Sequence, residues 1–406
     1  MNPKSWILTM GCAALFACSS AQSSGGFADP GGDDGDGGAS GSSNGATSSG
    51  GGASSGAVAS GSSGGTASGS SGGTHSTTSS GSSGGAASSG AGDGGAPGIN
   101  WGTTLTADEV GQTVTLSAIP FTVAAGDEVY MCQVFDNPFG GVTTDLLSMH
   151  GTMSAGSHHF FLFSVTTLNT AVEPAVGTIG PCAGKGLEFH PFPFLSQQPD
   201  WTINYPTDSE GKPMGYSLVG SNQVMINAHY LNASSESITA NVSITITPAK
   251  AGVVQTHVGS IFLNNSSLSV PATATMSNPY QATETWSGGS GVPSTYSIFT
   301  SWSHMHQWGL KLSASTGSTA FYSETNWNSP GLFLHAPGMQ EPSTATGPLS
   351  PVQMTSSSPI TWDCSYFNNT GATLTFGDSA QTNVMCIYIG QYYPASATAP
   401  DVIYTE

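Results

Sequence analysis

Two histidines separated by one residue, His304 and His306 in the stretch SWSHMHQWG, have a spacing that suggests metal chemistry. In a β-strand, residues i and i+2 point to the same face of the sheet. The two imidazoles would therefore project together and could hold one metal ion, while Met305 between them would face the opposite side. For this pair taken alone, two surface histidines without a ligand remain the alternative.

Three more histidines lie in apolar runs that are typical of strands. His158 and His159 open the run HHFFLF, and His229 lies within INAHYL. Neighbours in an ideal strand face opposite sides, so His158 and His159 can act together only at a strand end or a β-bulge. Burying an imidazole without a partner is unfavourable. Each of the three therefore requires a partner, which could be a metal ion. For any one of them alone, a hydrogen bond in the core is the simpler explanation.

Taken together, these motifs resemble the copper type II, ascorbate-dependent monooxygenases, the family of peptidylglycine α-hydroxylating monooxygenase and dopamine β-monooxygenase. That family has a His-His pair before an apolar strand, then a His-Tyr motif. It continues with His-x-His followed by a glycine three residues on, and with Met-Cys before Tyr-Tyr-Pro. The chain matches all four in the same order, over most of residues 101 to 394, with HHFFLF, AHYLN, HMHQWG and MCIYIGQYYP.

The resemblance implies two copper ions per chain, at separate sites that face a wet cleft between two domains. It assigns an electron-supplying site to His158, His159 and His229. It assigns the catalytic, oxygen-binding site to His304, His306 and Met385. Ascorbate would reduce both ions, and O2 would hydroxylate a C–H bond of a small-molecule substrate. The ligand types suit copper independently, because a soft thioether with imidazoles favours copper, especially Cu(I).

Two positions depart from the peptidylglycine enzymes. Trp302 stands where those enzymes have a substrate-binding arginine, and Ile389 stands where they have a tyrosine. Tyr388 is one residue away, which places it on the other strand face. We therefore expect a more apolar or aromatic substrate than a peptidylglycine. Of the remaining polar residues, His150 and Asn227 are candidates for orienting a ligand, and surface or capping roles are expected for His190, His257 and His335.

Four cysteines remain besides Cys12 and Cys18, and an even number in an exported protein predicts two disulfides. Three pairings are possible. Proximity in the sequence favours Cys132–Cys182 and Cys364–Cys386. The family resemblance implies the same two bridges.

The N-terminus predicts an exported lipoprotein. Residues 1–18 combine Lys4, a short apolar run and LFAC, which resembles a bacterial lipobox with Cys18 as the lipidated residue. An ordinary secretory signal is the alternative. The expected location is the outer membrane or the cell surface, reached through the lipid anchor. Residues 19–98 are rich in Gly and Ser without apolar periodicity and predict a disordered tether.

The rest of the chain predicts an all-β fold. Short runs of β-branched and aromatic residues, bounded by Gly, Pro, Asn and Ser, are typical of antiparallel β-sandwiches. The length favours two jelly-roll-like sandwich domains, 99–250 and 251–406, with an interdomain cleft. The net charge of −19 and the absence of arginine argue against nucleic acid as a partner.

Two other functions remain open. One is a non-catalytic copper-binding lipoprotein of the same fold at the cell surface. The other is a metal-free adhesive sandwich on a stalk, which leaves the histidines and Met385 without a role. An enzyme would couple ascorbate and O2 consumption to product, whereas a copper store would hold Cu(I) unreactively.

Overall fold

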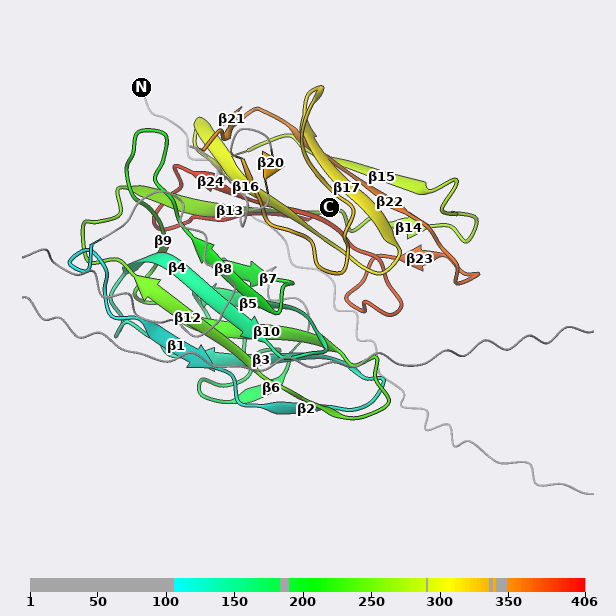
Figure 1. Cartoon of the computed structure of the whole chain (residues 1–406), viewed down its shortest axis with the longest axis horizontal. Helices are drawn as coiled ribbons and strands as arrows, with labels where there is room; N and C mark the ends of the chain where they lie inside the picture. The colour runs from blue at the N-terminus through cyan, green and yellow to red at the C-terminus, as the bar shows by residue number, and fades with distance from the viewer. Residues whose placement is uncertain (1–105, 183–189, 290, 336–338, 341–348, 406) are drawn as a thin grey trace, which may run out of the picture. The chain divides into compact units, whose positions relative to one another are not determined.

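The computed structural model describes residues 106–182, 190–289, 291–335, 339–340 and 349–405. Every helix-or-strand element within these ranges is a β-strand (Figure 1), which confirms the prediction of an all-β chain. None of the described residues forms a helix long and apolar enough to cross a membrane. The predicted signal peptide, the lipidation site at Cys18 and the tether at 19–98 lie outside the described residues.

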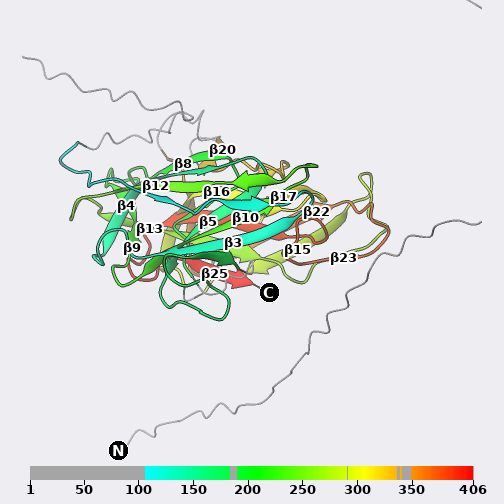
Figure 2. The same cartoon turned by 90° about the horizontal axis from the view of Figure 1, so that it is seen from below.

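The first half of the described chain forms two facing layers. One layer is a five-stranded sheet with the order β6-β3-β10-β5-β7, whose strands β3, β10 and β5 lie side by side in Figure 2. Its strands are β3 (Glu128–Phe135), β5 (Ser157–Val165), β6 (Ile179–Pro181), β7 (Phe194–Ser196) and β10 (Gln223–Leu231). The facing layer contains β1 (Val114–Ser117), β4 (Thr144–Met153), β8 (Asp200–Asn204), β9 (Met214–Leu218) and β12 (Val242–Pro248).

The second half forms another pair of layers. One is a four-stranded sheet with the order β15-β22-β17-β18, made of β15 (Tyr280–Trp286), β17 (Gly309–Thr316), β18 (Thr319–Glu324) and β22 (Ile360–Tyr366). In β22, the residues Ile360, Trp362, Cys364 and Tyr366 are buried and alternate with half-buried ones. That alternation is what a strand with one face on a core requires. Short pairs flank the larger sheets: β2 (Phe121–Val123) with β11 (Ile238–Ala240), and β14 (Ser269–Val270) with β23 (Leu374–Thr375).

Three strands separate two hydrophobic cores. They are β13 (Thr256–Asn264), β16 (Thr295–Met305) and β24 (Cys386–Tyr393), which are neighbours in one sheet. On β13, Val258 and Phe262 pack into the core that also holds the first-half layers, whereas Ile261 and Leu263 pack into the core beneath the four-stranded sheet. Both faces of these strands are therefore buried, and polar residues on them such as Ser301 and Gln391 are hydrogen-bonded within the protein.

One twelve-stranded sheet crosses the predicted domain boundary at residue 251. Strand β13 pairs in parallel with β9 of the first half and antiparallel with β24 of the second. The same sheet is extended by β19 (Phe333–His335), β20 (Met339–Gln340), β21 (Val352–Thr355) and β25 (Val402–Thr405). The division into domains 99–250 and 251–406 therefore stays a prediction, because strands on both sides of it share a sheet.

Both predicted disulfides are confirmed. Cys132 on β3 is bonded to Cys182, and Cys364 on β22 is bonded to Cys386 on β24, with Cα–Cα distances of 5.7 and 5.9 Å. The second bridge joins the two layers of the second half directly beside Met385. It therefore fixes the start of the strand next to one of the expected metal ligands.

The C-terminal strand is attached through a buried carboxylate. Asp401 accepts hydrogen bonds from the backbone N–H of Phe192 at 2.6 Å and of Ser260 at 2.9 Å, and from the hydroxyl of Tyr216 at 3.2 Å. Burial raises the pKa of Asp401 to about 7, against the lowering effect of these three donors. Next to it, Gly259 has no room for a side chain, because a Cβ there would lie 1.6 Å from the carbonyl oxygen of Pro400.

We therefore expect Gly259→Ala to displace the C-terminal strand from β13 and to lower the free energy of unfolding by about 1–3 kcal/mol, the usual cost of overpacking. Gly289→Ala is the matched control, because a Cβ at Gly289 meets no atom within 4 Å. Urea denaturation of both variants measures the difference. Equal stability of the two variants would show that the Pro400 contact does not hold the strand.

Candidate metal centre

A β-bulge brings His158 and His159 to the same site. In the pairing of β5 with β10, His159 lies opposite His229 and Ser157 lies opposite Tyr230, so His158 is the extra residue of an irregularity between these pairs. The bulge lets two consecutive side chains serve one cluster, as the sequence required. The ring centroids of these three histidines lie 4.9 to 5.1 Å apart.

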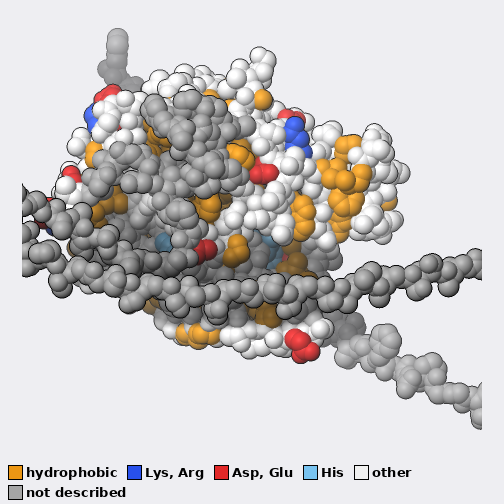
Figure 3. Space-filling view, viewed as in Figure 1, with side chains coloured by type: hydrophobic (Ala, Val, Ile, Leu, Met, Phe, Trp, Pro, Cys, Tyr) orange, Lys and Arg blue, Asp and Glu red, His pale blue; other side chains and the backbone are white. Residues whose placement is uncertain are grey.

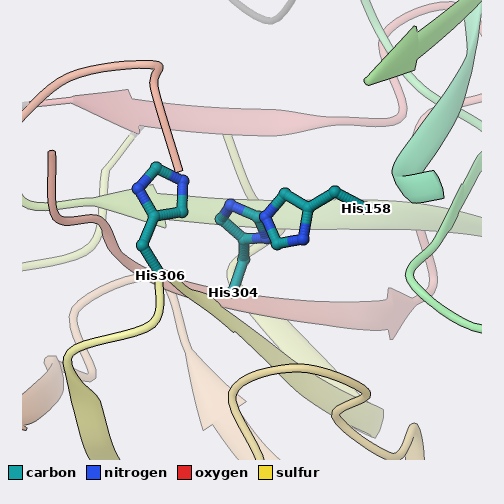
Figure 4. A group of neighbouring side chains, drawn as sticks. All are labelled: His158, His304 and His306. Carbon is teal, nitrogen blue, oxygen red and sulfur yellow. The ribbon is translucent and has the colours of Figure 1, made fainter. Parts of the chain in front are cut away.

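The end of β16 supplies the other two histidines. His304 lies on β16 and His306 directly follows it, and their rings approach His158 at 5.0 and 5.6 Å between centroids (Figure 4). Met305 between them is fully buried in the core beneath the four-stranded sheet, so it faces away from the imidazoles, as the strand period predicts. Gly309 is packed against Met305, since a Cβ there would lie 2.9 Å from the Met305 sulfur.

All five imidazoles form one buried cluster, and none is more than 6% exposed. Two groups of three could each hold a metal ion, because their candidate ligand nitrogens all lie within 4.8 Å of one another: His158, His159 and His229, and His158, His304 and His306. His158 belongs to both groups. The sequence predicted two separate ligand sets facing a wet cleft, whereas in the structure the two sets touch and form one buried cluster.

Outer hydrogen bonds fix which nitrogen of two imidazoles is available. His229 donates from Nε2 to Glu128 Oε1 at 2.8 Å, which leaves Nδ1 facing His159 Nε2 at 3.2 Å. His306 donates from Nδ1 to the carbonyl of Asn383 at 2.9 Å, which leaves Nε2 free. A carboxylate or carbonyl on the far nitrogen is the usual way in which proteins orient histidine ligands of metals.

Several imidazole nitrogens are buried without any partner among the described residues: His158 Nε2, His159 Nδ1, His304 Nε2 and His306 Nε2. A buried polar atom without a hydrogen bond costs about 1–3 kcal/mol. Four such atoms in one cluster would be a large penalty without a function. A metal ion that accepts their lone pairs removes much of it, so the residues fit a metal.

Burial also keeps these imidazoles neutral. It lowers the pKa of His158, His159 and His304 well below the usual value of 6.5, with neighbouring histidines adding to the effect. Burial likewise brings the pKa of His306 to about 4, although the Asn383 carbonyl opposes it. Neutral imidazole is the form that binds metals, so the ligands need not lose a proton at neutral pH.

Glu128 connects the cluster to the segment 378–383, which lies just before Met385. Its carboxylate accepts hydrogen bonds from His229, from the Ser379 hydroxyl at 2.6 Å and from the Ala380 N–H at 2.6 Å. Burial alone would raise the pKa of Glu128, but these hydrogen bonds outweigh it and lower the pKa to about 2. The carboxylate is therefore ionised at every physiological pH.

Tyr130 reinforces the same connection. Its ring stacks on His229 with 3.8 Å between centroids, and its hydroxyl donates to the carbonyl of Asp378 at 2.7 Å. The segment 378–383 thus contacts the first ligand set through Glu128 and Tyr130, and the second through the Asn383–His306 hydrogen bond. It joins two groups of ligands whose nearest members in the chain, His229 and His304, are 75 residues apart.

Met385 lines a small cavity on the other side of the cluster. The cavity is about 30 Å3 in volume and is also lined by His159, His304, Asn227 and Ile389. It has room for about two water-sized molecules. Met385 therefore lies beside His304, and the structure brings all six expected ligands into one region.

The two departures from the family pattern are partners in the sheet. Trp302 on β16 lies directly opposite Ile389 on β24, and both are buried. Tyr388 faces the other core, where its hydroxyl lies 2.9 Å from the Ser301 hydroxyl. The positions that carry an arginine and a tyrosine in the peptidylglycine enzymes are thus replaced by one apolar contact next to the cavity.

The hydrogen bonds of the remaining polar candidates go to other partners, although Asn227 lines the small cavity. His150 pairs with Asp200 at 2.9 Å and His257 pairs with Asp145 at 3.2 Å, both partly exposed. Asn227 contacts Cys182 Sγ at 3.6 Å rather than an imidazole. The expectation of surface roles is wrong for His190 and His335, which are buried against Glu173 and Ser301. Sequence reasoning missed Glu128, Tyr130 and the segment 378–383, because no motif marks a contact between such distant residues.

Comparisons with known proteins add no family assignment. No protein-family model matches the chain, and no curated protein matches it. Among solved structures, the major capsid protein P2 of bacteriophage PM2 aligns with 7% identity and a TM-score of 0.25, over 70% of this chain and 97% of that one. A structure of infectious bursal disease virus, Gx strain, aligns with 9% identity and a TM-score of 0.09, over 72% and 83%. At these scores neither alignment bears on function.

The lowered histidine pKa values predict an acid-sensitive metal-free protein. Imidazoles in the unfolded chain have a pKa of about 6.5, whereas burial lowers the pKa of His306 and His335 to about 4 and that of His158, His159 and His304 well below 6.5. Stability should therefore fall as the pH falls from 6.5 to 4, by about 1.4 kcal/mol per pH unit for each such histidine. The buried Asp401 has the opposite sign, since its raised pKa costs stability as the pH rises from 4 to 7, but it is a single group.

Urea denaturation of the metal-free protein at several pH values measures this slope. His304→Asn should reduce the slope, and Ser235→Asn should leave it unchanged because that exposed position carries no titratable group. A slope that is the same for both variants and the unmodified chain would contradict the burial of His304 as a neutral imidazole.

Glu128→Gln should loosen the segment 378–383. Glutamine keeps one oxygen and replaces the other with an NH2 donor, so it cannot accept from His229, Ser379 and the Ala380 N–H together, and the amide protons around Ala380 should exchange with solvent at least tenfold faster. Metal affinity should fall about 10- to 100-fold, as is usual when the outer partner of a histidine ligand is lost. Hydrogen exchange detected by mass spectrometry and competition for Cu(I) measure the two effects. Glu236→Gln, at an exposed position, is the control and should change neither.

Proposed function

We propose that this chain is a dicopper monooxygenase that hydroxylates a C–H bond of a small-molecule substrate with O2 and electrons from ascorbate. The observation that carries this proposal is the buried cluster of five neutral imidazoles with unpartnered nitrogens, next to a methionine in the same region. Nitrogen donors alone would suit several metals, but a thioether among them favours copper.

In this proposal the first copper is held by His158, His159 and His229, and the second by His304, His306 and Met385. When bound, the two ions supply the two electrons that hydroxylation with O2 consumes, one electron from each. The ring contacts of 5.0 to 5.6 Å between His158 and the histidines of the second set support electron transfer over a short path. Because His158 also lies within ligand distance of His304 and His306, it is the residue through which the two sets would communicate.

The chain's own residues would orient the ligands and exclude water. Glu128 and the Asn383 carbonyl hold the far nitrogens of His229 and His306, so that each ring presents its other nitrogen. Burial of the cluster keeps the imidazoles unprotonated and limits side reactions with water. The cavity beside Met385 and His304 is apolar and has the size of a diatomic molecule, which suits O2.

The proposed substrate is apolar or aromatic rather than a peptidylglycine. A substrate carboxylate would need a cation or several donors next to the second ligand set. The described residues at the two family positions are Trp302 and Ile389, which are packed against each other. This pair offers a carboxylate no cation and only the Trp302 indole N–H as a donor, and burying a carboxylate with so little compensation is costly.

We further propose that the protein is an outer-membrane or surface lipoprotein, anchored through Cys18, with a tether at 19–98 and catalytic domains at 99–250 and 251–406. The two disulfides support export, since such bonds persist in oxidising compartments. The anchor and the tether rest on the sequence alone.

A non-catalytic copper-binding protein is the second candidate. The observation that favours it is the low exposure of all five imidazoles, which suits storage of Cu(I) away from oxidants. Oxygen uptake with ascorbate separates the two: the enzyme consumes O2 in proportion to hydroxylated product, and the store consumes none beyond the rate of the metal-free protein.

The role of Met385 provides a sharper test. Met385→His should retain copper, because imidazole also binds it well, but should lose most turnover because the Cu(I) site is altered. Sulfur scattering at about 2.3 Å in Cu(I) X-ray absorption, a typical metal–sulfur distance, should disappear. Met305→Leu is the control, since Met305 faces the other core and a volume-conserving change there is tolerated. Loss of the sulfur signal in Met305→Leu instead would contradict the assignment of the second site.

A further inference from the structure

A second, larger cavity opens onto the histidine cluster beside His158. Its volume is about 380 Å3, and its lining includes Ser157, His158, Gln307, Trp327, Asn328 and Ala380. These residues come from the bulge of β5, from the turn after His306, from the loop after β18 and from the segment 378–383. The cavity therefore lies where both ligand sets and their connecting segment meet.

The two cavities differ in size, so they can hold different molecules. The one beside Met385 is about 30 Å3, too small for an organic molecule. The one beside His158 falls at the lower end of the range of about 300–1,000 Å3 that is typical of small-molecule sites. It reaches His158, whose ligand nitrogen lies within 4.8 Å of those of His304 and His306.

The lining of this larger cavity carries no formal charge. The carboxylate of Glu128, which is bonded to the lining residue Ala380, already accepts hydrogen bonds from His229, Ser379 and the Ala380 N–H, and only 13% of its side chain is exposed. Few Lys, Arg, Asp or Glu side chains are visible on the face drawn in Figure 3. A charged ligand would therefore lose hydration in the cavity without gaining an ionic partner.

The lining does offer one aromatic face and neutral polar groups. Trp327 is half-buried, packed against the core on one side, and its ring forms part of the cavity wall. Gln307 donates from Nε2 to the carbonyls of Ala380 and Gln381 at 3.3 Å, which holds its side chain in place and leaves Oε1 as an acceptor. Asn328 and Ser157 add an amide and a hydroxyl. Flat rings stack on Trp, and such contacts contribute about 0.5–1.5 kcal/mol beyond burial.

We infer that this cavity is the organic substrate site, and that it takes a small, uncharged molecule with an aromatic ring and one neutral polar group. The ring stacks on Trp327, and the polar group bonds to the amides of Gln307 and Asn328. Its role as a substrate site rests on the proposed monooxygenase function, but binding itself requires only the metal-free protein. A failure of binding is therefore distinguishable from a failure of copper chemistry.

Three flat probes of the same shape test the charge preference: benzamide, benzoate and benzamidinium. They are titrated into metal-free, full-length protein labelled with 15N-tryptophan, at 150 mM salt to limit the effect of the net charge. Benzamide should bind saturably and shift the indole N–H resonance of Trp327, which is assigned with Trp327→Phe. Its dissociation constant should be at least tenfold lower than those of the two charged probes. Saturable binding that leaves the Trp327 signal unmoved, equal affinity for a charged probe, or no saturable benzamide binding would each overturn the inference.

Two variants and one control complete the experiment. Trp327→Ala should weaken benzamide about fivefold or more through the loss of stacking. Asn328→Asp, at an exposed position that tolerates a charge, should reverse the order so that benzamidinium binds more tightly than benzamide. Trp201→Phe, on β8, should leave all three affinities unchanged. If Asn328→Asp leaves the order unchanged, Asn328 does not line the occupied site and the inference fails.

Discussion

Five neutral imidazoles from distant parts of the chain meet in one buried cluster, and four of their nitrogens have no partner among the described residues. Each unpartnered nitrogen there costs about 1–3 kcal/mol, so the four together approach the 5–15 kcal/mol by which a typical domain is stable. A metal ion that accepted these lone pairs would offset much of this penalty. The surrounding residues hold the rings in place. Glu128 and the Asn383 carbonyl accept hydrogen bonds from His229 and His306 and leave the other nitrogen of each ring available.

The two faces of the layer that contains β16 and β24 carry different kinds of residue. On β16, β24 and the residues that adjoin them, His304, Ile389 and Met385 face the first core and the cavities, whereas Met305, Tyr388 and Cys386 face the second core. The second face is held by the disulfide to β22 and by the buried tyrosines. Because side chains alternate along a strand, the ligands lie on one face and core residues on the other. A shift of the strand register by one residue would therefore exchange the residues of the two faces.

Residues close in sequence could be placed from the sequence, and residues joined only by folding could not. The bulge at His158 follows from the requirement that adjacent histidines serve one site, and Met305 follows from strand alternation. The disulfides follow from proximity and the family resemblance. The shared β9–β13 pairing does not follow, because apolar strands carry no signal of a parallel neighbour. The contact of the two ligand sets depends on Glu128 and Tyr130 meeting residues 378–380, about 250 positions away, which no local pattern encodes.

We expect this cluster to hold two ions rather than one shared ion, with sulfur bound to one of them. Anomalous diffraction from crystals of the copper-loaded protein, recorded above and below the copper absorption edge, tests this most directly. The predicted result is two copper peaks per chain, one among His158, His159 and His229 and one among His304, His306 and Met385. A single peak centred on His158, or peaks that show zinc under competition, would contradict it.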